Sequence, residues 1–183
     1  MRWLTVLVAA GWAGCDGGGD AAGTGETGET DGVTGTDSEA TSATTPGACV
    51  SGEEWTRGDM ESPLMHPGLD CIECHAARRG PPFVIAGTVF SAYHEPDDCN
   101  GRSGITVEIT DANGDVFEAQ TNSAGNFYLN PFQASIALPY TARILVNGTE
   151  TNAMAGAQSD GACNHCHTED GAQSAPGRIV VGD

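Results

Sequence analysis

The sequence contains no lysine, and seven arginines carry its only permanent positive side-chain charges. They stand against 25 aspartates and glutamates, so the formal net charge is −18. Proteins that bind nucleic acid need clustered positive charge to displace counterions from the phosphates. We therefore expect no nucleic-acid partner. The acidic surface is either simply solvated or steers the protein toward basic partners.

Aromatic and positively charged residues are absent from most of the first quarter of the chain. Residues 16–47 consist almost wholly of glycine, threonine, aspartate, glutamate, alanine and serine. Such a segment cannot bury enough apolar surface to offset the entropy lost on ordering. We predict that residues 15–48 form a disordered, solvated tether.

The apolar run near the N-terminus is too short to cross a bilayer. It spans residues 3–13, follows Arg2 and has the length of an export signal. The Ala-Gly-Cys sequence that ends at Cys15 resembles the end of a bacterial lipoprotein signal, although Trp12 stands where that family has an aliphatic residue. The resemblance implies that residues 1–14 are a signal peptide and that a lipid on Cys15 is the only membrane attachment. Ordinary cleavage nearby is the alternative.

Strand signals dominate the middle of the chain. We expect strands at residues 83–90, 105–110, 116–119, 127–129 and 140–146. In the second of them Ile105, Val107 and Ile109 alternate with polar residues, as in a half-buried strand. The predicted fold class is mainly β. Residues 83–148 are expected to form a small β-sandwich-like domain, flanked by loop or short-helix segments at 49–82 and 149–183.

A tight hairpin is predicted between the second and third strands. Asn113-Gly114 can supply the positive φ angles that such a turn needs. The following residues 121–128 resemble the strand after an Asp/Asn-x-x-Gly-x-Phe turn in carboxypeptidase regulatory-like and transthyretin-like β-sandwich domains. That resemblance implies a scaffold without catalytic residues.

Two pentads match the pattern Cys-x-x-Cys-His, one in each flanking segment. They comprise Cys71, Cys74 and His75 in the first, and Cys163, Cys166 and His167 in the second. Two thiols one helical turn apart can add to the two vinyl groups of a haem, while the adjacent imidazole binds the iron. The pattern predicts two covalently attached haems c, with His75 and His167 as proximal iron ligands.

Three other interpretations of the four motif cysteines compete with this one. A zinc site built from two Cys-x-x-Cys pairs would leave both histidines without a role. A thioredoxin-like redox motif needs a surrounding βαβ pattern, which the sequence lacks. Paired disulfides would not explain the histidines either.

The resemblance to known proteins extends beyond the pentads. It covers residues 62–75, 86–90, 94–99 and 163–168. These segments look like exported bacterial di-haem cytochromes whose haem segments flank a β domain. The resemblance implies that Met65 and Met154 are the distal iron ligands, with His66 a close rival for the first haem.

Two further histidines are candidates for the distal positions. His94 stands beside acidic residues that could orient it as a ligand, although a surface hydrogen-bonding role is the alternative. His165 lies inside the second pentad and could reach only a neighbouring haem, or is simply exposed. Met60 is expected to pack or to be exposed rather than to bind iron.

Cys49 and Cys99 remain once the anchor and the two pentads have taken five of the seven cysteines. In an oxidising compartment we expect these two to form a disulfide, although two buried free thiols are the alternative. It would tie the start of the folded region to its middle.

The predicted function is one-electron transfer in the cell envelope, to and from redox partner proteins, at the periplasmic face or the cell surface. We expect an electron carrier rather than an enzyme. One alternative is a haem enzyme or a sensor of gas or peroxide with one open iron position. Another is a surface module whose β domain binds a partner and whose cysteines are structural.

Overall fold

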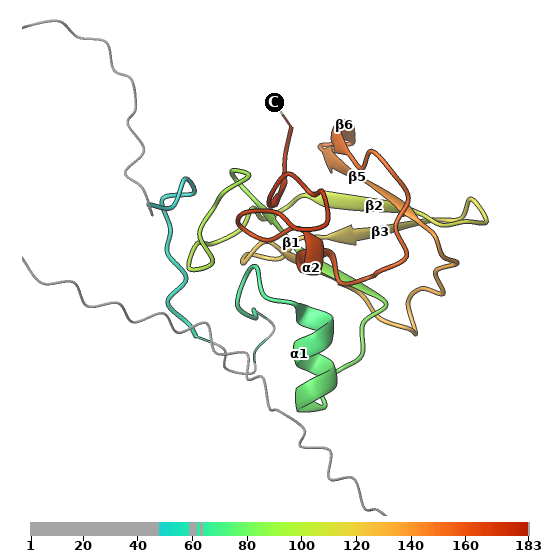
Figure 1. Ribbon diagram of the computed structural model, residues 1–183, viewed down its shortest axis with the longest axis horizontal. Coiled ribbons are helices and arrows are strands. Elements are labelled where there is room, and N and C mark those ends of the chain that lie inside the picture. The colour runs from blue at the N-terminus through green and yellow to red at the C-terminus, as the bar shows by residue number, and fades with distance from the viewer. Residues whose placement is uncertain (1–47, 59–61, 63, 183) are drawn as a thin grey trace, which may run out of the picture. The chain divides into compact units, whose positions relative to one another are not determined.

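Seven strands and two short helices make up the regular structure of residues 48–58, 62 and 64–182, the part of the chain that the computed structural model describes (Figure 1). The predicted signal at 1–14, Cys15, all but the last residue of the tether and Met60 lie outside these residues. The described fold is mainly β, as predicted. No helix in the described ranges is long and apolar enough to cross a membrane.

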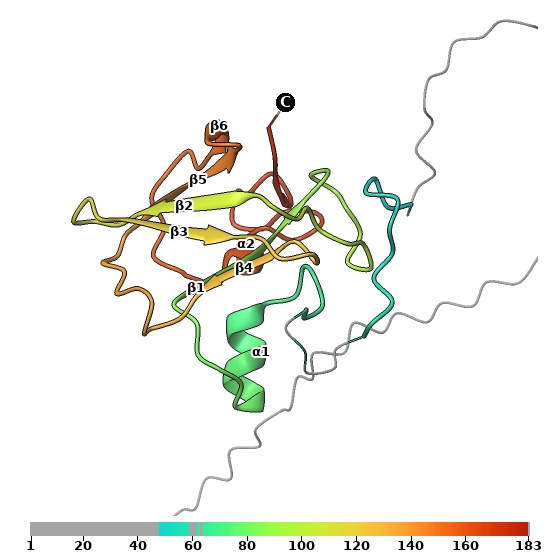
Figure 2. The same cartoon turned by 180° about the vertical axis from the view of Figure 1, so that it is seen from behind.

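The smaller sheet is built around a fully buried strand. β1 (Ile85–Phe90) is buried at all six positions. It pairs antiparallel with β4 (Asn126–Leu129) and parallel with β7 (Ile179–Val180), which gives the order β4-β1-β7. Figure 2 shows β1 and β4 side by side. Because β1 is the central strand, residues from both flanking segments can reach it.

The larger sheet is wholly antiparallel and has the order β3-β2-β5-β6. Its strands are β2 (Thr106–Thr110), β3 (Val116–Gln120), β5 (Thr141–Val146) and β6 (Thr149–Ala153). Apolar residues from both sheets form one core cluster, which includes Ile85 and Val89 of β1, Val107 and Ile109 of β2, Phe127 of β4 and Ile144 of β5. The burial of these side chains holds the elements together.

The predicted hairpin joins β2 to β3. The Asp111 carboxylate accepts hydrogen bonds from the backbone N–H groups of Asn113 and Asp115, at 2.8 and 2.9 Å. Its other oxygen accepts one from Ala137 at 3.0 Å, which ties the turn to the chain that leads to β5. Only Gly114 of the predicted Asn-Gly pair has a positive φ, of 86°.

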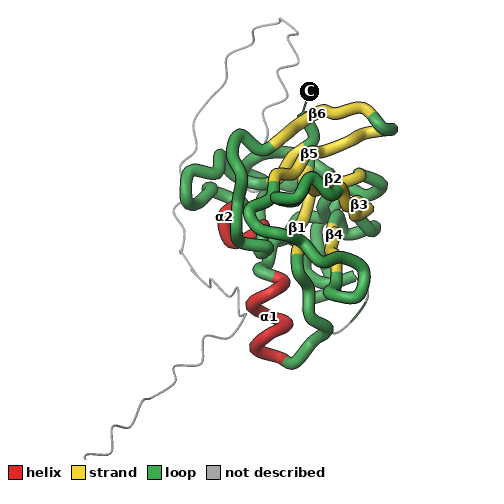
Figure 3. The backbone as a smooth tube through the Cα atoms, turned by 90° about the vertical axis from the view of Figure 1, so that its right-hand side faces the viewer, coloured by secondary structure: helices red, strands yellow, loops and turns green. Residues whose placement is uncertain are grey.

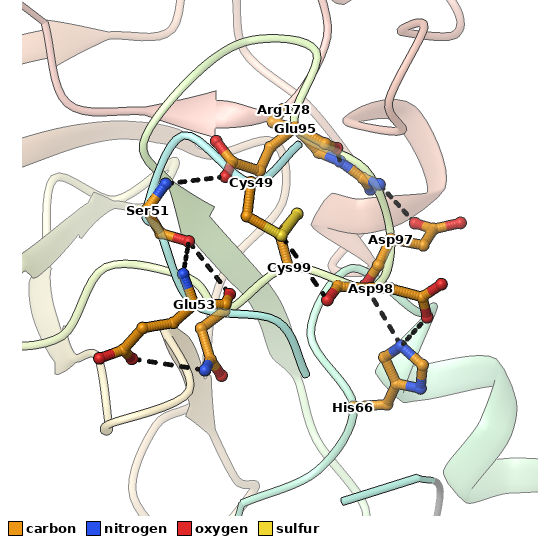
Figure 4. The surroundings of a disulfide bond; sticks show 10 residues. Cys49, Ser51, Glu53, His66, Glu95, Asp97, Asp98, Cys99 and Arg178 are labelled. Atoms are coloured by element: carbon orange, nitrogen blue, oxygen red, sulfur yellow. Dashed lines mark hydrogen bonds and ion pairs between the residues drawn. A yellow bond between two sulfur atoms is a disulfide. The ribbon is translucent and has the colours of Figure 1, made fainter. Parts of the chain in front are cut away.

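The predicted disulfide between Cys49 and Cys99 is confirmed (Figure 4). The two Cα atoms lie 5.4 Å apart, and 50 residues separate the cysteines in sequence. Beside the bond, the fully buried Glu95 accepts a hydrogen bond from the backbone N–H of Ser51 at 3.1 Å. The start of the described chain is therefore fixed both covalently and by a buried carboxylate.

The helices are the two pentad segments. Helix α1 (Cys71–Arg78) begins after Asp70, whose side chain caps it by accepting a hydrogen bond from the N–H of Glu73 at 2.9 Å. Helix α2 (Cys163–Cys166) is a single turn that contacts β1. Figures 1 and 3 show α2 near the N-terminal end of α1. The fold therefore brings together two pentads that are far apart in sequence.

Candidate functional site

The first pentad lies on α1, so its two thiols are one turn apart on the same helix face. Cys74 is buried, and Cys71 is half-buried. Capping by Asp70 starts the helix directly at Cys71. The local sequence thus gives the helical spacing that the pentad requires.

His75 is oriented by the loop that follows α1. Its Nδ1–H donates to the carbonyl of Pro81 at 2.8 Å, and its ring stacks at a tilt on Phe83 with centroids 4.5 Å apart. Gly80 allows this approach, because a Cβ there would lie 2.9 Å from the imidazole. The hydrogen bond fixes the tautomer and leaves the Nε2 lone pair available to a metal.

The second pentad is seated on β1. The backbone N–H of Ala86 donates to the Gly161 carbonyl at 2.9 Å, just before α2. Gly87 lets Cys163 come close, since a Cβ at Gly87 would lie 2.8 Å from the Cβ of Cys163. His167 follows α2, and its Nδ1–H donates to the Gly177 carbonyl at 2.8 Å. Both pentad histidines therefore have the same tautomer and the same kind of partner.

A cavity of about 490 Å³ opens against the second pentad. Its lining includes Cys163, Cys166 and His167, together with Met154, the predicted distal ligand. Much of the remaining lining is apolar and comes from the core faces of β1, β2, β4 and β5. The volume lies within the range of cofactor sites in proteins. A pentad, a thioether and an apolar chamber thus share one site.

Three of the four pentad thiols have raised pKa values. Burial raises the pKa of Cys71 to about 12, with the Asp70 carboxylate acting in the same direction. Burial likewise raises the pKa of Cys163 to about 12 and raises the pKa of Cys166. Redox-active Cys-x-x-Cys motifs have lowered thiol pKa values instead. These environments do not favour a dithiol oxidoreductase.

The described residues also argue against a four-cysteine zinc site. The sulfurs of such a site lie about 3.8 Å apart, given tetrahedral Zn–S bonds of about 2.3 Å. Among cysteine, histidine and acidic side chains in the described ranges, the one group of three or more ligand atoms within 4.8 Å is Cys49, Glu95 and Cys99. Two members of that group form the disulfide. The four pentad sulfurs do not converge on a common point.

Searches of protein-family models, curated proteins and solved structures found no match to this chain. Its function is therefore inferred from the geometry of the two pentads and of the cavity beside the second one.

Met65 and His66, two other predicted ligands, have different partners. The Met65 carbonyl accepts a hydrogen bond from the Asn126 side chain at 2.6 Å, which holds Met65 beside β4. His66 instead contacts the loop before the disulfide, with Nε2 3.2 Å from the Asp97 carbonyl and 3.8 Å from an Asp98 carboxylate oxygen (Figure 4). His66 thus has a role in joining loops.

The remaining two histidines are exposed. The Nδ1–H of His94 donates to the Glu169 carbonyl at 2.8 Å, just after the second pentad. His165 pairs with Asp160 at 2.9 Å, and this contact raises the pKa of its imidazole. Each of them thus bonds to a residue that flanks the second pentad.

Sequence reasoning missed two groups of buried polar residues. Thr88, Asn126 and Asn164 are 1%, 5% and 4% exposed and lie between the pentads. Arg178 is 1% exposed, and its guanidinium bonds to Asp97 and lies 4.7 Å from the ring centroid of Phe90. Such residues are mostly exposed in proteins, so composition gave no signal for them. The position of Asn164 inside a pentad was the one available clue.

Proposed function

We propose that this protein is a di-haem c-type cytochrome that transfers single electrons in the cell envelope. The observation that carries the proposal is the matched environment of the two pentad histidines. Each donates Nδ1–H to a backbone carbonyl at 2.8 Å, which orients the ring and leaves Nε2 for iron. Two separate loops, after α1 and after α2, provide the same arrangement.

The surroundings of the second pentad support the proposal of a haem there. The cavity beside it is bounded by apolar core residues and contains Met154 in its lining. Tyr140, which is buried, donates its hydroxyl to the Asp160 carbonyl at 2.7 Å and lies 3.9 Å from the Cys163 sulfur. Cys163 and Cys166 would attach the haem, His167 would be the proximal ligand and Met154 the distal one.

The first pentad has a more open environment. His75 contacts Phe83, and Phe83 in turn contacts Tyr128, whose side chain is 44% exposed. Cys71 and Cys74 would attach this haem and His75 would bind its iron. Because His66 is engaged by Asp97 and Asp98, Met65 is the favoured distal ligand.

A bound haem supplies one-electron redox chemistry, and the chain fixes its ligands, burial and exposure. The two sheets would form the predicted sandwich-like scaffold between the haem segments. The net charge of −18 favours basic redox partners. A lipid on Cys15 would hold the protein at the membrane, with the tether as a flexible stalk. The protein would act as a carrier rather than as an enzyme.

The decisive test is the number of covalently bound haems. The full chain is produced in a strain that can mature c-type cytochromes. After denaturation and acid-acetone extraction, the haem that stays on the polypeptide is counted. We expect two haems per chain. The double variants Cys71→Ala/Cys74→Ala and Cys163→Ala/Cys166→Ala should each retain one, and Cys49→Ser/Cys99→Ser should retain both.

The same sample separates the rival functions. If the exported wild type carries no covalent haem, the remaining candidate function is the surface module with structural cysteines. Two haems of which one binds carbon monoxide in the resting reduced protein would point to the sensor or enzyme. Two haems that do not react with carbon monoxide support the carrier.

A further inference from the structure

Three buried polar side chains connect the two pentads. Asn164 lies between Cys163 and Cys166, Thr88 lies on β1, and Asn126 begins β4. The Asn164 side-chain oxygen accepts a hydrogen bond from the Thr88 backbone at 3.0 Å, and its amide donates to the Thr88 hydroxyl at 3.1 Å. The Thr88 hydroxyl donates to Asn126 at 2.7 Å. A hydrogen-bonded amide in a buried position has a defined orientation.

The same three side chains hold the chain that leads into the first pentad. Asn164 donates to the Leu69 carbonyl at 2.8 Å, two residues before Cys71. The Gly68 N–H donates to the Thr88 hydroxyl at 3.0 Å, while Asn126 donates to the Met65 carbonyl. The second pentad thus contacts the lead-in of the first directly, through one side chain.

Two further observations show that the pentads meet at this network. A cavity of about 470 Å³ is lined by Asp70 and Glu73 from the first pentad region and by Asn164 and His165 from the second. Cys71 also lies near enough to Cys163 to contribute, after burial, to raising the pKa of that thiol. The attachment points of the two predicted haems are therefore neighbours.

We propose that Asn164 is a positioning residue that fixes how the two haem-attachment sites face each other, so that the two haems form one coupled pair. This inference rests on the proposed function. The direct path from Cys163 to Cys71 consists of backbone bonds and the hydrogen bond from Asn164 to Leu69. Loss of the amide would remove this direct hydrogen bond between the pentads while leaving all four thiols and both histidines in place.

Asn164→Ala is the principal variant, and Thr88→Val, which removes the shared hydroxyl with little change in volume, is the second. Asn113→Ala, at an exposed hairpin position, is the matched control. The readout is visible circular dichroism in the haem absorption band, where two haems held close together give a paired positive and negative signal. Redox titration of the same samples measures whether oxidation of one haem shifts the potential of the other.

We expect the wild type and Asn113→Ala to show the paired signal and two interacting redox steps. Asn164→Ala and Thr88→Val should keep two haems, but the amplitude of the paired signal should fall severalfold. Their two redox steps should become independent. An unchanged signal in a haem-loaded Asn164→Ala protein would overturn the assignment. A wild type with two haems and no paired signal would also overturn it while the proposed function stood. A wild type without haem would instead refute the proposed function.

Discussion

At the scale of single residues, the site depends on close contacts that only particular side chains permit. The two pentad histidines are held through Nδ1 by carbonyls of Pro81 and Gly177. The cysteines are held by packing, and Cys163 contacts β1 at the position where Gly87 has no side chain. We therefore expect single substitutions at these positions to change the site or the stability of the fold.

Replacing Met154 tests the distal ligand of the second haem. In the haem-loaded protein, Met154→Ala should convert one haem from low to high spin. It should also lower that haem's potential, because a thioether ligand raises the potential within the range of about 0.8 V that axial ligands span. Absorption spectra and redox titration measure both effects. Met65→Ala serves as the counterpart and should alter the other haem. Unchanged spectra in both variants would assign the distal positions to His66, His94 or His165.

Replacing Gly87 tests the seat of the second pentad. Gly87→Ala would place a methyl group 2.8 Å from the Cβ of Cys163 and 2.9 Å from the Phe127 ring. Overpacking of this kind costs about 1–3 kcal/mol of unfolding free energy. Urea unfolding followed by far-ultraviolet circular dichroism measures the loss. Gly156→Ala is the control, since its added Cβ would meet nothing within 4 Å. Equal midpoints for the two variants would contradict the packing argument.

At the scale of elements, the strongly patterned strands were predictable from sequence and the weakly patterned ones were not. The five predicted strands all form, with ends that shift by at most two residues. β6 has the sequence Thr-Glu-Thr-Asn-Ala and no apolar alternation, so only its register with β5 defines it. β7 is two residues long and pairs with β1 across a large separation in sequence. Local patterns cannot report such long-range pairing.

The site shows the same division. Spacing alone groups the cysteines and histidines into two pentads, because the chemistry predicted for each pentad is local. It gave no account of Asn164, Thr88 and Asn126, whose importance comes from being buried where the two pentads meet. The carbonyl partners of His75 and His167 are backbone groups, and a sequence pattern does not specify them.

The β2–β3 hairpin should make the free energy of unfolding depend on pH in the acidic range. Four backbone N–H groups, of Ala137, Asp115, Asn113 and Gly114, hold the pKa of the Asp111 carboxyl below its ordinary value. Its contribution to stability is complete above the ordinary pKa of about 3.9, and is lost as the pH falls through the lowered value.

Comparison with Asp111→Asn isolates this contribution. Urea midpoints of the two proteins, measured from pH 7 down to pH 2.5, should differ by a constant amount above about pH 4. The difference should shrink toward the acid end, because the carboxyl takes up a proton in the unfolded chain before it does so in the folded one. A difference that stays constant over the whole range would show that the carboxylate charge has no part in holding the turn.

At the scale of the whole molecule, the disulfide is the covalent link between the start of the described chain and its middle. Removing it in Cys49→Ser/Cys99→Ser should lower the free energy of unfolding by up to about 4 kcal/mol, given the 50-residue separation and the loop-closure estimate for the unfolded chain. Urea unfolding measures the change. The wild type in reducing agent should match the variant, and a variant as stable as the oxidised wild type would contradict this role.

The hydrogen bond from Asn164 to Leu69 also implies an order of events during biogenesis. It joins residues 95 positions apart, so it can form only after the end of the chain has emerged and folded back. On the proposed function, the maturation machinery must reach Cys163 and Cys166 before α2 docks on β1. Haem attachment at the second pentad would therefore precede this docking. Docking of α2 would then close the molecule around a cofactor that it already carries.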